Sequence, residues 1–66
     1  MSSRFRVMVP GGNSIFVSTY EAALEQAKAV MARNGFGYIY TLGAGPSRLV
    51  ARFAPFYGVV PASPSV

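Results

Sequence analysis

The segment Tyr20–Met31, with the sequence YEAALEQAKAVM, decides the fold. Its apolar residues recur at spacings of three and one, which aligns them on one helical face: Tyr20, Ala23, Leu24, Ala27, Val30 and Met31. Just before it, Ser18 and Glu21 have the spacing of a capping box, with Ser18 as the N-cap. Just after it, Asn34-Gly35 supplies a stop signal, with glycine suited to the left-handed position. The sequence therefore predicts one amphipathic helix that is buried along a single face.

Strands are predicted on both sides of this helix. The N-terminal pair is separated by a Pro-Gly-Gly-Asn turn, and the C-terminal pair by a glycine-rich loop at residues 43–47. Alternation of apolar residues and enrichment in aromatic and β-branched residues are typical of strands. The predicted strands are residues 4–9, 14–18, 36–42 and 48–54.

The predicted fold is a single small α+β domain of order ββαββ. Two hairpins form an antiparallel sheet, and the helix packs on one face and leaves the other face open. Residues 56–60 form a short apolar stretch that either pairs at a sheet edge or docks on a neighbour. We expect residues 1–60 to form the compact domain and residues 61–66 to form a flexible C-terminal tail.

Four of the six basic residues have strand spacing and are predicted to lie on the open face: Arg4, Arg6, Arg48 and Arg52. Successive side chains on a strand point to opposite faces, so the residues of the other parity should face the helix. Those residues are apolar: Phe5, Val7, Val9, Leu49, Ala51 and Phe53. The open face is therefore the best binding surface that the chain offers.

Two registers are possible for the second hairpin, because a shift of one residue exchanges the faces of a strand. A five-residue loop places Tyr38 opposite Arg52 and brings Tyr38 and Tyr40 onto the arginine face. In that register Phe53 lies opposite Gly37 and fills the space that the glycine leaves. A four-residue loop buries both tyrosines instead. We favour the first register, and the sequence leaves both open.

The first hairpin has the same ambiguity. A three-residue loop buries Ile15 and Val17 and leaves Phe16 with the arginines, and we favour it because it buries two β-branched residues. In either register Met8 and Val50 are predicted to lie among the arginines. Apolar residues between arginines are typical of an interface. The predicted interface residues are Met8, Phe16, Val50, Phe56 and Tyr57.

Length and composition limit the class of protein. A chain of 66 residues makes one domain, and without cysteine it has no disulfide or thiolate metal site to stabilise it. Because 52% of the residues are apolar, much of that surface cannot be internal, and we expect a homo-oligomer. The net charge of +4 arises because Glu21 and Glu25 are the only acidic residues, and it favours anionic partners.

Residues Asn34–Thr41, with the sequence NGFGYIYT, resemble the RNP1 segment of RNA-recognition motifs. The central specified positions match, whereas Asn34 and Thr41 depart from the pattern. The resemblance implies that Phe36 and Tyr38 stack on bases. That family has a βαββαβ order and a companion aromatic motif on its first strand, and this chain has neither. The sequence does not assign the chain to the family.

The sequence offers no catalytic group that suits neutral pH, because histidine and cysteine are absent. Glu21 and Glu25 lie on a solvent-facing helical surface and make a weak metal site. The loop at 43–47 precedes a strand, whereas a phosphate cradle requires a following helix. We expect no enzymatic activity, cofactor or metal. No apolar run approaches the length of a membrane span, so a cytoplasmic protein without a membrane partner is expected.

Two functional hypotheses follow. In the first, the four arginines bind the phosphates of a nucleic acid or a sequestered nucleotide while Tyr38 and Tyr40 stack on its bases. In the second, the same face binds an acidic protein partner. The chain would then be a small inhibitor or adaptor, of the kind that phages carry as accessory proteins.

Overall fold

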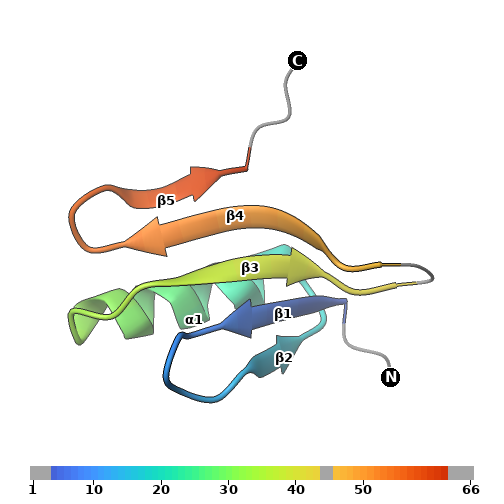
Figure 1. Cartoon of the computed structure of the whole chain (residues 1–66), viewed down its shortest axis with the longest axis horizontal. Coiled ribbons are helices and arrows are strands. Elements are labelled where there is room, and N and C mark those ends of the chain that lie inside the picture. The colour runs from blue at the N-terminus through green and yellow to red at the C-terminus, as the bar shows by residue number, and fades with distance from the viewer. Residues whose placement is uncertain (1–3, 44–45, 63–66) are drawn as a thin grey trace.

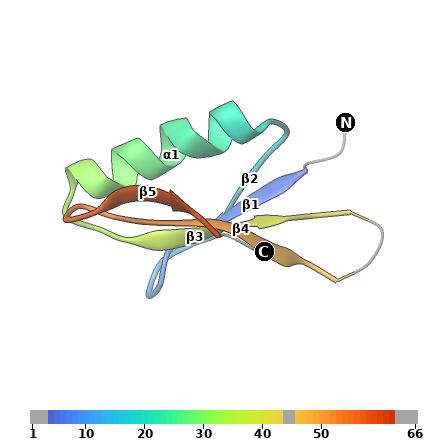
Figure 2. The same ribbon diagram turned by 90° about the horizontal axis from the view of Figure 1, so that it is seen from above.

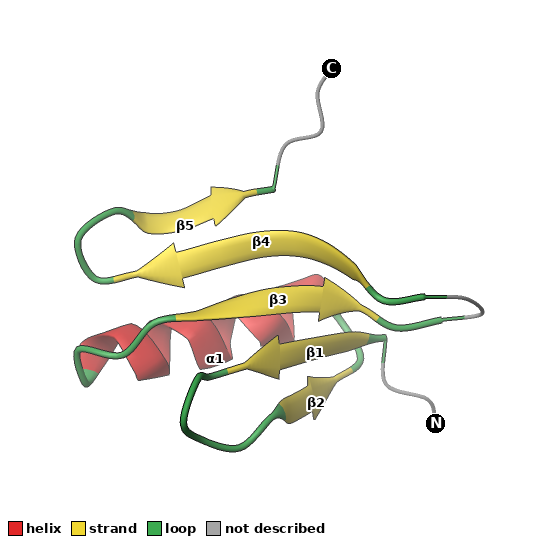
Figure 3. Ribbon diagram, in the orientation of Figure 1, coloured by secondary structure: helices red, strands yellow, loops and turns green. Residues whose placement is uncertain are grey.

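The computed structural model describes residues 4–43 and 46–62 and contains five strands and one helix within them. Figure 1 shows their arrangement, and Figure 3 shows the same view coloured by secondary structure. In chain order the elements are β1 (Phe5–Met8), β2 (Ile15–Val17), α1 (Tyr20–Ala32), β3 (Gly37–Thr41), β4 (Arg48–Ala54) and β5 (Gly58–Pro61).

The strands form one antiparallel sheet in the order β2-β1-β3-β4-β5. The helix α1 lies across one face of this sheet, and no described element covers the other face (Figure 2). The prediction of a small α+β domain with a helix on one face of an antiparallel sheet is therefore confirmed. The two-hairpin order ββαββ is wrong, because residues 58–61 add a fifth strand and make the order ββαβββ.

The fifth strand also changes the expected boundary of the sheet. Pro61, expected in the tail, pairs with Ala51, and the Ala62 amide donates to the Val50 carbonyl at 2.8 Å. The sheet thus extends past residue 60. The rest of the predicted tail, residues 63–66, and residues 44–45 of the predicted loop lie outside the described residues.

Both ends of α1 differ by one residue from the prediction. The N-cap is Thr19, whose hydroxyl accepts from the Ala22 amide at 3.1 Å, so Glu21 stands one position too early to complete a capping box. At the other end, Asn34 takes the left-handed conformation with φ 65°, and the Gly35 amide donates to the Val30 carbonyl. The glycine is still required, because a Cβ on Gly35 would lie 2.7 Å from a Val30 methyl group.

The core lies between α1 and the sheet. The helix contributes Ala23, Ala27 and Val30, and two of these are alanines, which let the helix approach the sheet closely. The strands contribute Val7, Ile39, Ala51 and Phe53. Phe53 is the largest fully buried side chain, and it lies opposite Gly37 as predicted. A Cβ on Gly37 would lie 2.8 Å from the Phe53 ring and would collide with the Met8 carbonyl oxygen.

Candidate site on the open sheet face

Strand pairing defines which side chains share the face away from α1, called here the open face. Val7 and Ile39 are buried against the helix, so their neighbours in the strand point the other way. One row across the open face is Phe16, Arg6, Tyr40 and Leu49, and the next is Met8, Tyr38, Arg52 and Val60. The favoured register of the first hairpin is confirmed, because Phe16 pairs with Arg6 while Ile15 and Val17 pack towards the core.

The second hairpin follows neither predicted register along its whole length. Near the helix, Tyr38 pairs with Arg52 and Gly37 with Phe53, as the five-residue loop predicts. A β-bulge then shifts the register between Ile39 and Tyr40, so Tyr40 pairs with Leu49, as the four-residue loop predicts. Because the bulged strand is β4, both tyrosines of β3 keep their place on the open face.

The bulge removes Arg48 from the open face, contrary to the prediction. Arg48 pairs with Thr41, and Thr41 pairs with Phe5, which packs on the helix side of the sheet. Leu49, expected in the core, instead reaches the open face beside Tyr40 and is 41% exposed. The bulged residue is Val50, which has no paired residue on β3 and packs half-buried against the core, not among the arginines.

Six side chains of the open face form a continuous diagonal series, called here the Arg–aromatic track. Its members in order are Phe16, Arg6, Tyr40, Tyr38, Arg52 and Tyr57. Cross-strand pairing joins Phe16 to Arg6 and Arg6 to Tyr40. The rings of Tyr40 and Tyr38 lie 6.5 Å apart, and Tyr38 pairs with Arg52. The Arg52 guanidinium lies 5.8 Å from the centre of the Tyr57 ring. The track therefore crosses β2, β1, β3 and β4, with one arginine on each side of the central tyrosine pair, and it ends at Tyr57 in the β4–β5 turn.

Both arginines of the track are positioned by neighbours. Arg6 Nε donates to the Ser14 hydroxyl at 3.0 Å, and its Nη2 lies 3.9 Å from the Met8 sulfur. Met8 thus lies beside an arginine, as predicted. Arg52 is exposed and is held by its contact with Tyr57. Arg4, also exposed, lies just before β1 and two residues from Arg6, so the alternation of side chains gives both the same face. The Arg4 carbonyl accepts from the Leu42 amide at 2.7 Å.

The exposed aromatics Phe56 and Tyr57 lie in the turn between β4 and β5. Their rings meet edge to face with centres 5.4 Å apart, and Phe56 is 86% exposed. Both residues were predicted to lie in an interface, but the contact between Tyr57 and Arg52 was not predicted, because it depends on the β4–β5 turn. Leu49 was missed for a different reason, since nothing in the local sequence marks the bulge.

The two carboxylates lie away from the open face. Glu21 and Glu25 are exposed residues of α1, which covers the opposite side of the sheet. The arginines of the open face therefore have no carboxylate on their own face among the described residues. The charged side chains that the described residues place on the open face are therefore all positive.

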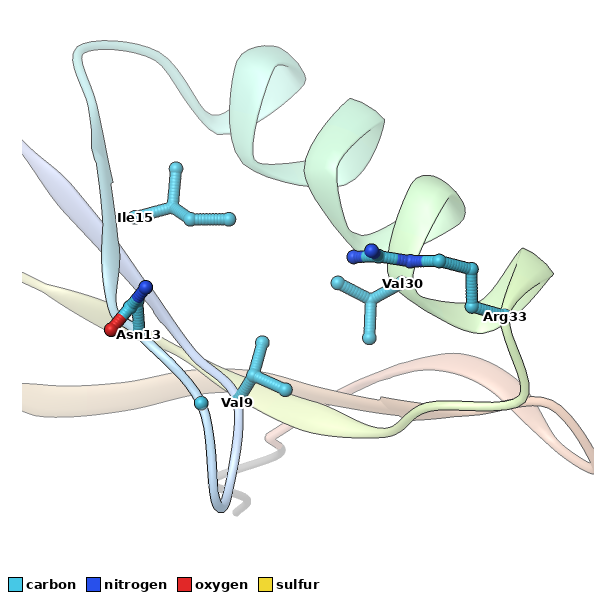
Figure 4. Close-up of a pocket in the computed structure, with 6 residues that line it drawn as sticks. Val9, Asn13, Ile15, Val30 and Arg33 are labelled. Atoms are coloured by element: carbon cyan, nitrogen blue, oxygen red, sulfur yellow. The ribbon is translucent and has the colours of Figure 1, made fainter.

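A pocket of about 270 Å³ lies on the helix side, between the first hairpin and the C-terminal end of α1 (Figure 4). Its lining is mainly apolar, with Asn13 and Arg33 as the polar side chains: Val9, Gly12, Asn13, Ile15, Val30 and Arg33. None of the residues predicted to bind a ligand contributes to it. The pocket and the open face are therefore separate surfaces.

No protein-family model, curated protein or solved structure is similar to this chain. Within residues 4–43 and 46–62, no helix is both long and apolar enough to cross a membrane. The same residues contain no group of three or more histidine, cysteine or acidic side chains that could hold a metal ion.

Proposed function

We propose that this chain is a non-enzymatic binding protein whose open face holds an anionic, phosphate-bearing ligand, either a nucleic acid or a nucleotide. The observation that carries the proposal is the Arg–aromatic track on a face where residues 4–43 and 46–62 place no carboxylate. Arginine presents planar donors that match phosphate oxygens, and tyrosine presents a ring on which a base can stack. Arg4 adds a third cation beside the track.

Native mass spectrometry of the protein purified at low salt tests this proposal, since it reports bound ligand and stoichiometry together. We expect a co-purified nucleotide or oligonucleotide, or its uptake when a mixture of both is added. Absence of both adducts at low salt would overturn the proposal.

Self-association stays a prediction from the high apolar content. Two copies stacked through their open faces would place Arg4, Arg6 and Arg52 of one copy near the same arginines of the other. This repulsion between positive charges is unfavourable. We therefore propose that a homo-oligomer, expected from composition, uses another surface and leaves the open face free. Light scattering after size exclusion tests the oligomer, and a monomer near 7.0 kDa would overturn it.

A protein partner is the second candidate, and the position of Leu49 favours it. The bulge places Leu49 opposite Tyr40 on the open face, where an unbroken register would place Val50, and in the same row as the exposed Phe16. A mixed arginine and apolar surface suits an acidic protein partner. In that case, binding should depend on Leu49 and Phe16 more than on the tyrosines, and added oligonucleotide should not compete.

A further inference from the structure

We propose that the ligand of the open face is a single-stranded nucleic acid that crosses the sheet along the Arg–aromatic track, an inference that rests on the proposed function. The track combines the two side-chain types that such a strand requires, with an arginine on each side of the central tyrosine pair. Aromatic rings stack on bases of any sequence, and arginines neutralise the phosphates between them.

The two tyrosines at the centre of the track have the spacing for neighbouring bases. Their ring centres lie 6.5 Å apart with planes inclined by 48°, so one base cannot lie flat on both rings. Each tyrosine therefore offers a separate stacking surface. Two successive bases of an extended strand, splayed apart, match this arrangement.

The arginines lie on either side of this central pair. Arg6 is on β1 beside Tyr40, and Arg52 is on β4 beside Tyr38. The two positions are offset by two strand spacings and two residues, which places their Cα atoms roughly 12 Å apart. A line between the two arginine positions crosses β3 between Tyr40 and Tyr38, so a backbone that follows the charges brings its bases next to both rings.

The shape of the site favours a strand over a free nucleotide. Small ligands are usually enclosed by a concave pocket that buries most of their surface. The track lies along one face of a sheet, whereas the 270 Å³ pocket lies on the helix side and contains none of the track residues. A ligand that gains affinity by repeated contacts along a surface fits the track better than one that requires enclosure.

The charge of the face favours a single strand over a duplex. Duplex binding relies chiefly on neutralising phosphates, and three arginines supply few such contacts. The bases of a duplex are stacked on one another and present only their edges. Stacking on tyrosine requires unpaired bases, so the aromatic part of the track contributes only with a single strand.

The test is fluorescence anisotropy with a labelled pyrimidine single strand of about 12 nucleotides, a duplex of equal length, and ATP as competitor. We expect the single strand to bind at least about tenfold tighter than the duplex. The logarithm of its affinity should fall linearly with the logarithm of salt concentration, with a slope of about −2 for three neutralised phosphates.

Two arginine variants provide a matched pair. Arg52 and Arg48 are both exposed residues of β4, and the bulge places them on opposite faces. We expect Arg52→Met to weaken single-strand binding about fivefold and to reduce the salt slope by about 0.7, which is one phosphate contact. Arg48→Met removes the same charge and should change the affinity less than about twofold at about 150 mM salt, where distant charges are screened.

A tyrosine pair isolates stacking. Tyr40→Leu keeps an apolar side chain but removes the ring, and we expect about tenfold weaker binding with the salt slope unchanged. Tyr40→Phe restores the ring and should restore affinity. Circular dichroism confirms the fold of each variant, and the exposed Arg52 and Arg48 sites keep the test valid if Tyr40→Leu does not fold.

The outcomes separate this inference from the proposed function. Binding of ATP without binding of the single strand would overturn the inference of a single-stranded ligand. The proposed function, binding of a phosphate-bearing ligand, would still hold. Equal affinity for single strand and duplex would also overturn the inference that a single strand binds along the track. An equal loss of single-strand affinity in Arg52→Met and Arg48→Met would do the same. Failure of strand, duplex and ATP to bind at low salt would overturn both.

Discussion

The inner part of β4, Ala51–Ala54, and its outer part, Arg48–Val50, behave differently although they belong to one strand. The inner part lies beneath α1 between β3 and β5, and it buries Ala51, Phe53 and Ala54. The outer part belongs to the end of the β3–β4 hairpin that extends past the helix (Figure 2). Its residues Arg48 and Leu49 are exposed.

This difference shows which part of β4 determines the register of the β3–β4 hairpin. In the inner part, Phe53 must lie opposite Gly37, so burial fixes the pairing. The outer part has no helix above it, and a one-residue shift there does not bury a polar side chain or expose a core one. The bulge at Val50 lies at the boundary between the two parts and exchanges the faces that Arg48 and Leu49 would otherwise occupy.

Truncation of Phe53 should give the largest effect. Phe53→Ala removes a fully buried ring and should cost about 4 kcal/mol. The free energy of unfolding expected for a domain of this size is about 3 to 10 kcal/mol, so the variant should lose about half its stability or unfold. Urea denaturation followed by circular dichroism measures the change.

The matched variant in the outer part is Leu49→Ala, which should cost less than about 1 kcal/mol because the side chain is 41% exposed. Equal losses at the two positions would show that the outer part is also buried in solution. The inner and outer parts of β4 would then not differ in burial.

A methyl group on Gly37 should give the next largest effect. Gly37→Ala forces a Cβ against the Phe53 ring and the β1 backbone, so we expect a loss of about 2 to 3 kcal/mol. The melting temperature should fall by more than about 8 °C. Gly43→Ala, in the outer hairpin, is the control, because a Cβ there meets nothing within 4 Å. An unchanged melting temperature for Gly37→Ala would mean that the inner register differs from the one described.

Much of the inner part was predictable from sequence. The helix, the positions of the first four strands and the fit of Phe53 to Gly37 follow from apolar periodicity and from the volume of one ring. The fifth strand also had a signal, since Pro55 and Gly58 match a turn followed by a left-handed residue. The Tyr57 amide donates to the Ala54 carbonyl at 3.2 Å, and Gly58 has φ 76°. This turn was not predicted.

The outer part was not predictable in the same way. Arg48 would share the face of Arg52 only if the alternation of side chains continued unbroken between them, and the unpaired residue Val50 interrupts it. No special residue marks the position, because a valine in a strand is ordinary. The positions on the open face were therefore predicted correctly for Arg6, Met8, Phe16, Tyr38, Tyr40 and Arg52, and wrongly for Arg48 and Val50. The binding roles of these residues stay predictions.

Loss of the helix cap should have a smaller effect and should act on the inner part, which the helix covers. Thr19→Ala removes the acceptor for the Ala22 amide, and we expect a loss of about 1 kcal/mol. Ser18→Ala is the control and should change stability by less than about 0.5 kcal/mol, because Ser18 is not the cap. A larger loss for Ser18 than for Thr19 would restore the capping box predicted from sequence. Thermal denaturation followed by circular dichroism distinguishes the two.

The smallest effects on stability are expected from substitution of the two arginines of β4, Arg52 and Arg48, and the two effects should differ. Arg52→Met removes the contact between the guanidinium and the Tyr57 ring, and for an exposed pair we expect a loss of about 0.5 to 1 kcal/mol. Arg48→Met should change stability by less than about 0.5 kcal/mol, because the side chain is exposed and only its backbone amide reaches Thr41 Oγ1, at 3.4 Å. The double variant Arg52→Met with Tyr57→Leu, compared with each single variant in urea denaturation, isolates the pair from the cost of each truncation. A coupling energy near zero would mean that Arg52 is not held by Tyr57. The track would then end at Arg52, without Tyr57, and Arg52 would differ from Arg48 only in the face on which it lies.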